Sequence, residues 1–85
     1  MSEYVEKQRY LLYHINMKIL FSERLVLLRN EKGLTQSELA KILNTTQRRI
    51  SYLETGKAEP DLRTLVALSS YFEVSIDYLI GVKDY

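Results

Sequence analysis

The segment from Thr46 to Gly56 carries polar side chains whose donors and acceptors match those on the edges of nucleic-acid bases. A glutamine can pair with adenine through two hydrogen bonds, an arginine can pair with guanine O6 and N7, and a tyrosine can contact a thymine methyl group. Ile50 and Leu53 are spaced to face a core, so the other side chains of a helix over 46–55 face outward. These outward residues are Gln47, Arg48, Ser51 and Tyr52. They are candidates for base reading, and an ordinary solvated polar face is the alternative.

A second helix is predicted to begin just before this one and to set its direction. Thr35-Gln-Ser-Glu38 fits a capping box, in which the Thr35 hydroxyl accepts from the Glu38 amide and the Glu38 carboxylate accepts from the Thr35 amide. Asn44 tolerates the left-handed backbone of a sharp turn, and Thr46 can cap the next helix. Two short helices joined by so tight a turn cross at a steep angle, which predicts a helix-turn-helix over 34–56.

The rest of the chain is predicted to be helical and to build a core around this unit. Glycines stand where helices should end, and Pro60 and Asp61 stand where the fourth helix should begin. The predicted helices are 21–32, 35–43, 46–55, 62–72 and 76–80. The residues predicted to face inward are Phe21, Leu25, Leu28, Leu39, Ala40, Ile42, Leu43, Ile50, Leu53, Leu62, Leu65, Leu68 and Phe72. The sequence therefore predicts an all-α domain with five helices.

Length and composition favour one small domain and argue against an enzyme. A chain of 85 residues supports a single core without a large enclosed active site. It has no cysteine for a disulfide or a thiolate nucleophile, and its single histidine, His14, cannot form a Cys/His zinc site alone. The sequence also lacks a glycine-rich phosphate loop. We therefore expect no catalytic residues, no metal, no cofactor and no small-molecule ligand.

The expected location is the cytoplasm, with no contact with a membrane. Charged residues interrupt every apolar stretch before it reaches the ~20 residues that span a bilayer. The N-terminus mixes acidic and basic residues and lacks the plan of a secretory signal.

Charge is distributed unevenly along the chain, although the net charge is only +1. Four basic residues and one acidic residue between Lys41 and Lys57 give that segment a charge of +3. Two basic and five acidic residues between Ala58 and Tyr85 give a charge of −3. One end of the domain can therefore face a polyanion that the other end would repel. Chance clustering in short segments is the alternative interpretation.

Several motifs together resemble the XRE family of helix-turn-helix regulators, which includes the Cro and lambda-type phage repressors. They are Gly33-Leu-Thr-Gln-Ser-Glu-Leu-Ala, Thr45-Thr-Gln-Arg-Arg-Ile-Ser, Glu54-Thr-Gly-Lys, Pro60 and Val74-Ser-Ile-Asp-Tyr-Leu-Ile-Gly81. The resemblance covers about 18–81. It implies a lambda-repressor-like bundle of five helices that binds DNA with the third helix, 46–55, in the major groove.

The resemblance also implies a role for each polar side chain of this unit. Gln47, Arg48 and Tyr52 fall at positions that read bases, and Ser51 lies beside them. Gln36 would bind a phosphate through its amide and side chain at a helix N-terminus, where the helix dipole favours an anion. The implied contacts with the DNA backbone are Arg29, Thr35, Gln36, Thr46, Arg49 and Lys57.

Three features limit what can be carried over from the family. Arg29 and Glu54 match a family pair in which the acid orients the arginine near a phosphate, but a partly exposed salt bridge of little effect is the alternative. Arg49 and Tyr52 depart from the smaller or amide residues of related phage repressors, so the operators of those repressors cannot be transferred. Glu59, in the loop after the third helix, is unfavourable beside a phosphate.

Residues 1–17 lie outside the resemblance and form an extension to the domain at 18–85. Alternating apolar residues around Tyr13, Ile15 and Met17 suggest a short strand, which could pair with its copy as a dimerisation arm. The alternatives are a partly disordered tail, an internal start at Met17, or a helix. That helix would carry Val5, Leu12, Ile15 and Ile19. The candidate dimer-interface residues are Tyr13, Ile15, Met17, Tyr78, Val82 and Tyr85.

The function that the resemblance implies is sequence-specific binding of double-stranded DNA by a bacterial or phage-encoded transcriptional regulator, with repression as the expected direction. Family members commonly bind palindromic operators as homodimers. The rival interpretation is a protein-interaction module of the same fold, such as an antitoxin or an anti-repressor, whose main partner is another protein.

Overall fold

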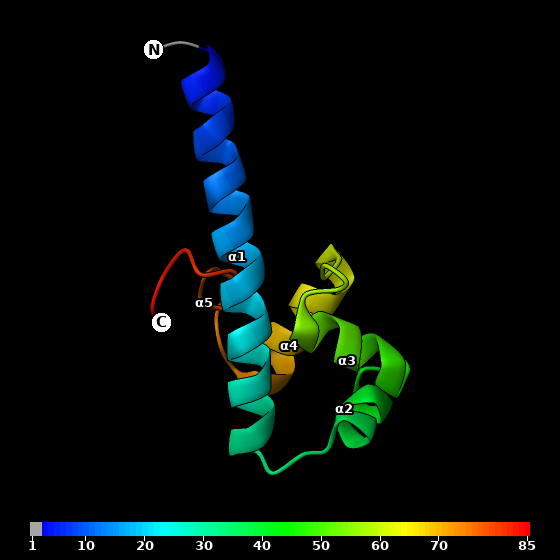
Figure 1. Cartoon of the computed structure of the whole chain (residues 1–85). Coiled ribbons are helices and arrows are strands. Elements are labelled where there is room, and N and C mark those ends of the chain that lie inside the picture. The colour runs from blue at the N-terminus through cyan, green and yellow to red at the C-terminus, as the bar shows by residue number, and fades with distance from the viewer. Residues whose placement is uncertain (1–2) are drawn as a thin grey trace.

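The computed structural model describes residues 3–85 and consists of helices joined by short turns (Figure 1). The helices are α1 (Glu3–Glu31), α2 (Gln36–Ile42), α3 (Gln47–Thr55), α4 (Leu62–Phe72) and α5 (Ile76–Leu79). No strand occurs within the described range, so the prediction of an all-α fold with five helices is confirmed. None of the helices in this range is long and apolar enough to cross a bilayer.

The first helix is much longer than predicted, and the strand proposed for the extension is wrong. α1 runs without interruption for 29 residues, and its N-terminal half projects beyond the rest of the molecule (Figure 1). A single strand would leave its backbone hydrogen bonds unmade, whereas a helix makes them within itself. Of the alternatives, the helical one is confirmed for the described part. Residues 1 and 2 of the extension lie outside the described residues.

The core lies where the lower half of α1 meets the four shorter helices. Its buried residues are Phe21, Leu25, Leu28, Leu39, Ala40, Ile50, Leu53, Leu68, Phe72 and Leu79. Leu43 and Leu65 are partly buried against this core, as the spacing predicted. Ile42 and Leu62, however, are 43% and 73% exposed, and their predicted inward positions are wrong. Ile42 is the last residue of α2 and Leu62 is the first residue of α4, so both stand at helix ends, where their side chains are left exposed.

The helix starts follow the predicted caps closely. The hydroxyl of Thr35 accepts from the Glu38 amide, and the Glu38 carboxylate accepts from the Thr35 amide at 2.9 Å. Thr46, Asp61 and Ser75 cap α3, α4 and α5 in the same manner, each accepting from the amide three residues on. Each cap satisfies an amide that the first turn of a helix otherwise leaves unpaired. Local sequence therefore fixes where each of the four shorter helices begins.

Arg24 of α1 ties the C-terminal segment to that helix. The Arg24 guanidinium donates to the Tyr78 carbonyl and, at 2.9 Å, to the Lys83 carbonyl. It also lies 4.4 Å from the centre of the Tyr78 ring, a cation–π contact. Gly81 follows in a left-handed conformation, φ +81°, directly against Leu20. These contacts hold α5 on the side of α1 opposite α3 (Figure 1).

Candidate nucleic-acid interface

The crossing of α2 and α3 depends on a sharp turn between them and on two core residues, Ala40 and Ile50. Asn44 adopts a left-handed conformation, φ 54°, as predicted. The Thr45 amide then donates to the Ala40 carbonyl at 2.8 Å, which closes the turn. Ala40, 3% exposed, lets α3 approach closely, and Ile50 of α3 is fully buried beneath the crossing. The helix-turn-helix predicted over 34–56 is therefore present.

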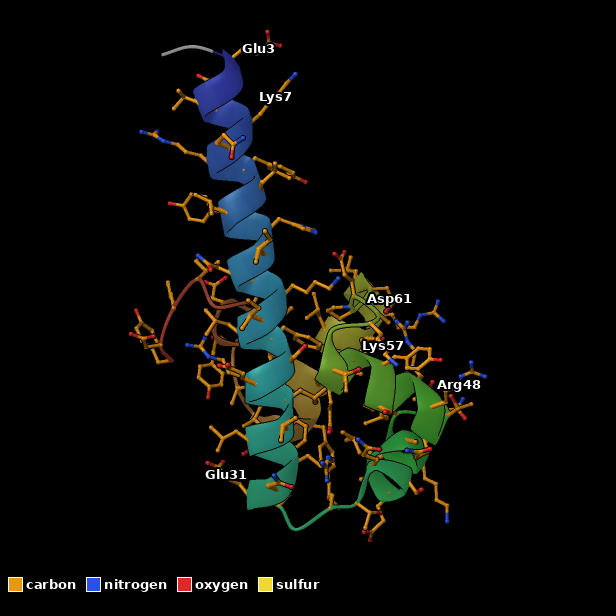
Figure 2. The ribbon with its side chains drawn as sticks, viewed as in Figure 1. Glu3, Lys7, Glu31, Arg48, Lys57 and Asp61 are labelled. Carbon is orange, nitrogen blue, oxygen red and sulfur yellow. The ribbon has the colours of Figure 1, made fainter. Side chains whose placement is uncertain are left out.

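The outer face of α3 carries the side chains predicted to read bases. Gln47 and Arg48 are exposed in its first turn, and Ser51 and Tyr52 are partly exposed in the next. Figure 2 shows Arg48 pointing into solvent from the side of α3 that faces away from α1. Gln47, Arg48, Ser51 and Tyr52 thus share one accessible surface at the N-terminal half of the helix.

Two cations surround the Tyr52 ring. The Arg48 Nε donates to the Tyr52 Oη at 3.0 Å, and the guanidinium carbon lies 5.3 Å from the ring centre. The Lys57 Nζ lies 5.5 Å from the same ring. Tyr52 therefore gathers two positive charges at the surface, where a phosphate or a guanine edge could meet them.

A chain of hydrogen bonds connects the first turn of α3 to α1 through the first residue of α2. Arg29 forms two bonds with Glu54, Nε to Oε2 at 2.6 Å and Nη2 to Oε1 at 3.0 Å. Gln36 Nε2 also donates to Glu54 Oε1 at 3.0 Å, and Gln47 Nε2 donates to Gln36 Oε1 at 2.6 Å. The side chains of Arg29 and Glu54 are only 14% and 5% exposed. We call these four residues the glutamine relay.

The relay explains what the Arg29–Glu54 pair does in this fold. The hydrogen bond that Arg29 donates to Glu54 raises the pKa of Arg29. A third bond from Arg29, to the Leu34 carbonyl at 2.7 Å, joins the end of α1 to the start of α2. The pair is therefore an internal anchor and not the weak surface bridge that was the alternative. Sequence reasoning paired Arg29 with Glu54 but missed that Gln36 and Gln47 complete the set.

The remaining residues predicted to contact the DNA backbone serve different local roles in the structure. The hydroxyls of Thr35 and Thr46 act as helix caps. Arg49 turns away from Gln47 toward the loop before α4, where its Nη2 donates to the Glu59 carbonyl at 3.3 Å. Arg49 is therefore separated from the base-reading set and lies near the start of α4.

The carboxylate of Glu59 contacts α1. Its Oε1 lies 2.7 Å from Nε2 of His14 on α1. From its position in the sequence alone, this carboxylate is an unfavourable neighbour for a phosphate near Lys57. The structure turns it toward α1, which lessens that objection.

The residues suggested for a dimer interface do not form one surface. Tyr13 is 70% exposed and Ile15 is 51% exposed, but residues two apart on a helix point to opposite sides. Tyr78 is half-buried beneath Arg24, while Val82 and Tyr85 are exposed in the C-terminal segment. Met17 is half-buried. A common face for Tyr13, Ile15 and Met17 required a strand, and it is wrong because the segment is a helix. Whether any of these side chains meets a second copy stays a prediction.

The chain is similar to known proteins over the part that carries this site. A family model described as Helix-turn-helix matches residues 25–79. The SPbeta prophage-derived uncharacterized HTH-type transcriptional regulator YonR of Bacillus subtilis (strain 168) is 44% identical over 61 residues, 72% of this chain and 56% of the relative. The HTH-type transcriptional activator BcrR of Enterococcus faecalis is 42% identical over 64 residues, 75% of this chain and 31% of the relative. The chain spans about half the length or less of these curated relatives.

Two solved structures share the fold. A transcriptional regulator from Listeria innocua has a TM-score of 0.69 at 39% identity, covering 72% of this chain and 57% of that protein. The P22 c2 repressor in complex with a synthetic operator has a TM-score of 0.70 at 31% identity, covering 75% of this chain and 97% of the repressor. The family-model match over residues 25–79 includes α2, α3 and the turn between them. The chain therefore belongs to the XRE-type helix-turn-helix family, as its motifs predicted.

Proposed function

We propose that this protein binds double-stranded DNA in a sequence-specific manner and regulates transcription, with α3 in the major groove. The observation that carries the proposal is the glutamine relay, which fixes an exposed glutamine beside an exposed arginine in the first turn of α3. A recognition helix makes its base contacts with this turn. The names of the relatives, all HTH-type regulators, support the same function. The chain of the P22 c2 repressor that shares the fold was solved with an operator.

Base reading falls to the four side chains on the outer face of α3. Gln47, held by Gln36, would present its amide to adenine, and Arg48 would form two bonds with guanine. Tyr52 would contact a thymine methyl group or a phosphate, and Ser51 would fit beside either base. Each well-formed pair contributes about 1–3 kcal/mol of discrimination against the wrong base pair.

Backbone contacts would hold α3 in register on the duplex. Gln36 begins α2 and can offer its backbone amide to a phosphate at the positive end of the helix dipole. Lys57 and Arg49 add charge at either end of α3, and Arg29 would support the phosphate site through Glu54. Thr35 and Thr46 can each donate a hydroxyl proton to a phosphate while still capping their helices.

The enzyme, partner and location expectations follow from the same proposal. A DNA-binding regulator needs no catalytic residue and works in the cytoplasm beside the chromosome. It would bind a palindromic operator as a homodimer, because one copy of α3 reads only half of such a site. Repression is the expected direction when the operator overlaps a promoter, and a reporter gene carrying the selected operator tests that direction.

The proposal is tested by selecting bound duplexes from a random pool and by measuring the affinity of the protein for the most enriched duplex at several salt concentrations. A specific site should emerge and bind in the nanomolar range, and log affinity should fall linearly with log salt. Arg48→Ala should weaken binding, whereas Lys83→Ala, which removes the same charge from the C-terminal segment, should not. Failure to enrich any sequence, with equal effects of the two variants, would contradict the proposal.

A further inference from the structure

The N-terminal half of α1 exposes apolar side chains on several sides, and three of them lie along one line. Leu12, Ile15 and Ile19 are 61%, 51% and 50% exposed, and they follow Gln8 at spacings of four, three and four. This is the spacing of a coiled-coil seam. We call Gln8, Leu12, Ile15 and Ile19 the arm seam.

We propose that the arm seam binds the same seam of a second copy, with the two α1 helices antiparallel and the two-fold axis between Leu12 and Ile15. The spacing four, three, four reads the same in both directions, so a reversed copy presents a matching row. Leu12 then packs on the partner subunit's Ile15, and Gln8 packs on the partner subunit's Ile19. The helical segment outside the body, marginal in water when alone, gains a packing partner.

Charge and size both fit a second copy as the occupant. No charged residue lies on the seam, and the flanks place Arg9 opposite the partner subunit's Asn16 and Leu11 opposite the partner subunit's Lys18. No like charges therefore meet across the pair. Pairing over about five turns of each helix would remove on the order of 1,000 Å² from water, the lower limit for a specific interface. A modest dimer that DNA strengthens is expected.

A groove lies where this arrangement would place the first turns of the partner subunit's α1. It has a volume of about 340 Å³ and runs between α1 and the end of α3, lined by Ile19, Ser22, Glu23, Thr55 and Gly56 among others. In the antiparallel register, the first turns of the partner's α1 lie against 19–22. The groove therefore continues the seam at each end of the pair.

The same register matches the repeat of DNA, an argument that rests on the proposed function. α3 is fixed to α1 by Ser22, whose Oγ donates to the Leu53 carbonyl at 2.8 Å, and by Arg29, which bonds Glu54. The C-terminal end of α3, at Leu53 and Glu54, thus lies level with about residue 25 of α1. At a rise of ~1.5 Å per residue, that is ~17 Å along α1 from the two-fold axis, or ~35 Å between the two copies of this end of α3. Half-sites one turn apart are separated by ~34–36 Å.

The direction of the axis also favours the antiparallel pair. Ser22 and Arg29 mark the side of α1 that faces α3, and Arg24 marks the side that faces α5. By helical geometry the seam falls between these two sides. A two-fold axis perpendicular to α1 can leave both α3 helices on one side of the dimer, where one duplex can reach them. An axis parallel to α1 would turn them to opposite sides.

The first experiment measures molar mass and DNA binding together. The full chain should dimerise, the double variant Leu12→Glu/Ile15→Glu should be monomeric, and Tyr13→Glu, the same change on another side of the helix, should remain dimeric. On a palindromic duplex the double variant should lose about 10²-fold or more in affinity but keep its half-site sequence preference. A monomeric full chain at high concentration, alone and on the duplex, would overturn the proposal.

The second experiment fixes the register without disturbing the seam. Because the chain has no cysteine, Lys7→Cys and Glu31→Cys each accept one spin label per copy. The antiparallel register predicts separations of about 20 Å between the two positions 7 and about 50 Å between the two positions 31. Similar short distances at both positions would mean a parallel pair and would overturn the register. If the distances agree but no duplex is bound, the dimer stands and the proposed DNA function fails.

Discussion

Gln47 Nε2 lies 2.6 Å from Gln36 Oε1, so the first residue of the recognition helix is held by the first residue of the helix before it. Gln36 is itself bonded to Glu54, whose carboxylate is neutralised by Arg29. The side chain that would meet an adenine is therefore oriented before DNA arrives. Less rotamer freedom remains to be lost on binding.

Removing the middle of this relay should damage base reading from a distance. Gln36→Ala takes away the acceptor of Gln47 and one phosphate donor, so affinity should fall and discrimination at the base pair read by Gln47 should weaken. A double-mutant cycle with Gln47→Ala should give a coupling energy of about 0.5–3 kcal/mol. Titration of duplexes substituted at single base pairs measures both effects, and strictly additive losses would mean that the two glutamines act independently.

Loss of the buried acid should unfold the protein more readily. Glu54→Ala leaves the Arg29 guanidinium charged and 14% exposed without its carboxylate partner, which should cost about 3 kcal/mol of unfolding free energy. Urea denaturation measures this change. Glu31→Ala, which removes an exposed acid at the end of α1, is the matched control and should change stability by less than ~0.5 kcal/mol. Equal stability of the two variants would show that the pair is only a surface bridge.

Gly81 should be far less tolerant of a side chain than Gly33. Both have positive φ, +81° and +67°, but a Cβ at Gly81 would lie 2.6 Å from Leu20 Cδ1, whereas nothing lies within 4 Å at Gly33. Gly33→Ala should cost about 1 kcal/mol for the left-handed backbone alone. Gly81→Ala should lose the same backbone contribution and about 1–3 kcal/mol more of unfolding free energy, because the new methyl group overpacks against Leu20. Thermal unfolding measures both variants and the double variant Gly81→Ala/Leu20→Ala. If Leu20→Ala restores no stability to Gly81→Ala, overpacking against Leu20 is not the cause of the loss.

Acid should weaken the start of α4 through Asp61. Its hydrogen bonds with Thr64 hold the pKa of Asp61 below its ordinary value of 3.8, with a smaller contribution from Arg49. A carboxyl group with a lowered folded pKa contributes stability above the unfolded value, and that contribution is lost as pH falls through the folded value. Asp61→Asn keeps a neutral cap. The variant should therefore lose less stability than the parent chain below about pH 4, and parallel stability curves would exclude the effect.

Local signals in the sequence predicted the fold well, because helix caps and glycine stops act over a few residues. Thr35, Thr46 and Ser75 each cap the helix that was predicted to start there. The extension was mispredicted because apolar residues at 12, 15 and 19 satisfy a helical spacing while 13, 15 and 17 satisfy a strand spacing. Only the hydrogen bonding of the whole segment decides between the two.

The sequence predicted which residues form the site but not the hydrogen bonds that join them. The outward face of α3 followed from Ile50 and Leu53, which are buried as expected. The bond between Gln36 and Gln47 depends on the angle at which two helices cross, and no single helix pattern contains that angle. Ile42 was misplaced for a related reason, since its exposure depends on which elements happen to cover the end of α2.

The most direct test of the central claim is a base-pair-resolved binding profile for Gln47→Ala and Arg48→Ala on the selected operator, each compared with the parent chain at one salt concentration. Each variant should lose about 1–3 kcal/mol and relax discrimination at one position per half-site, adenine-containing for Gln47 and guanine-containing for Arg48. Unchanged affinity and an unchanged profile for both variants would contradict the assignment of α3 as the base-reading helix.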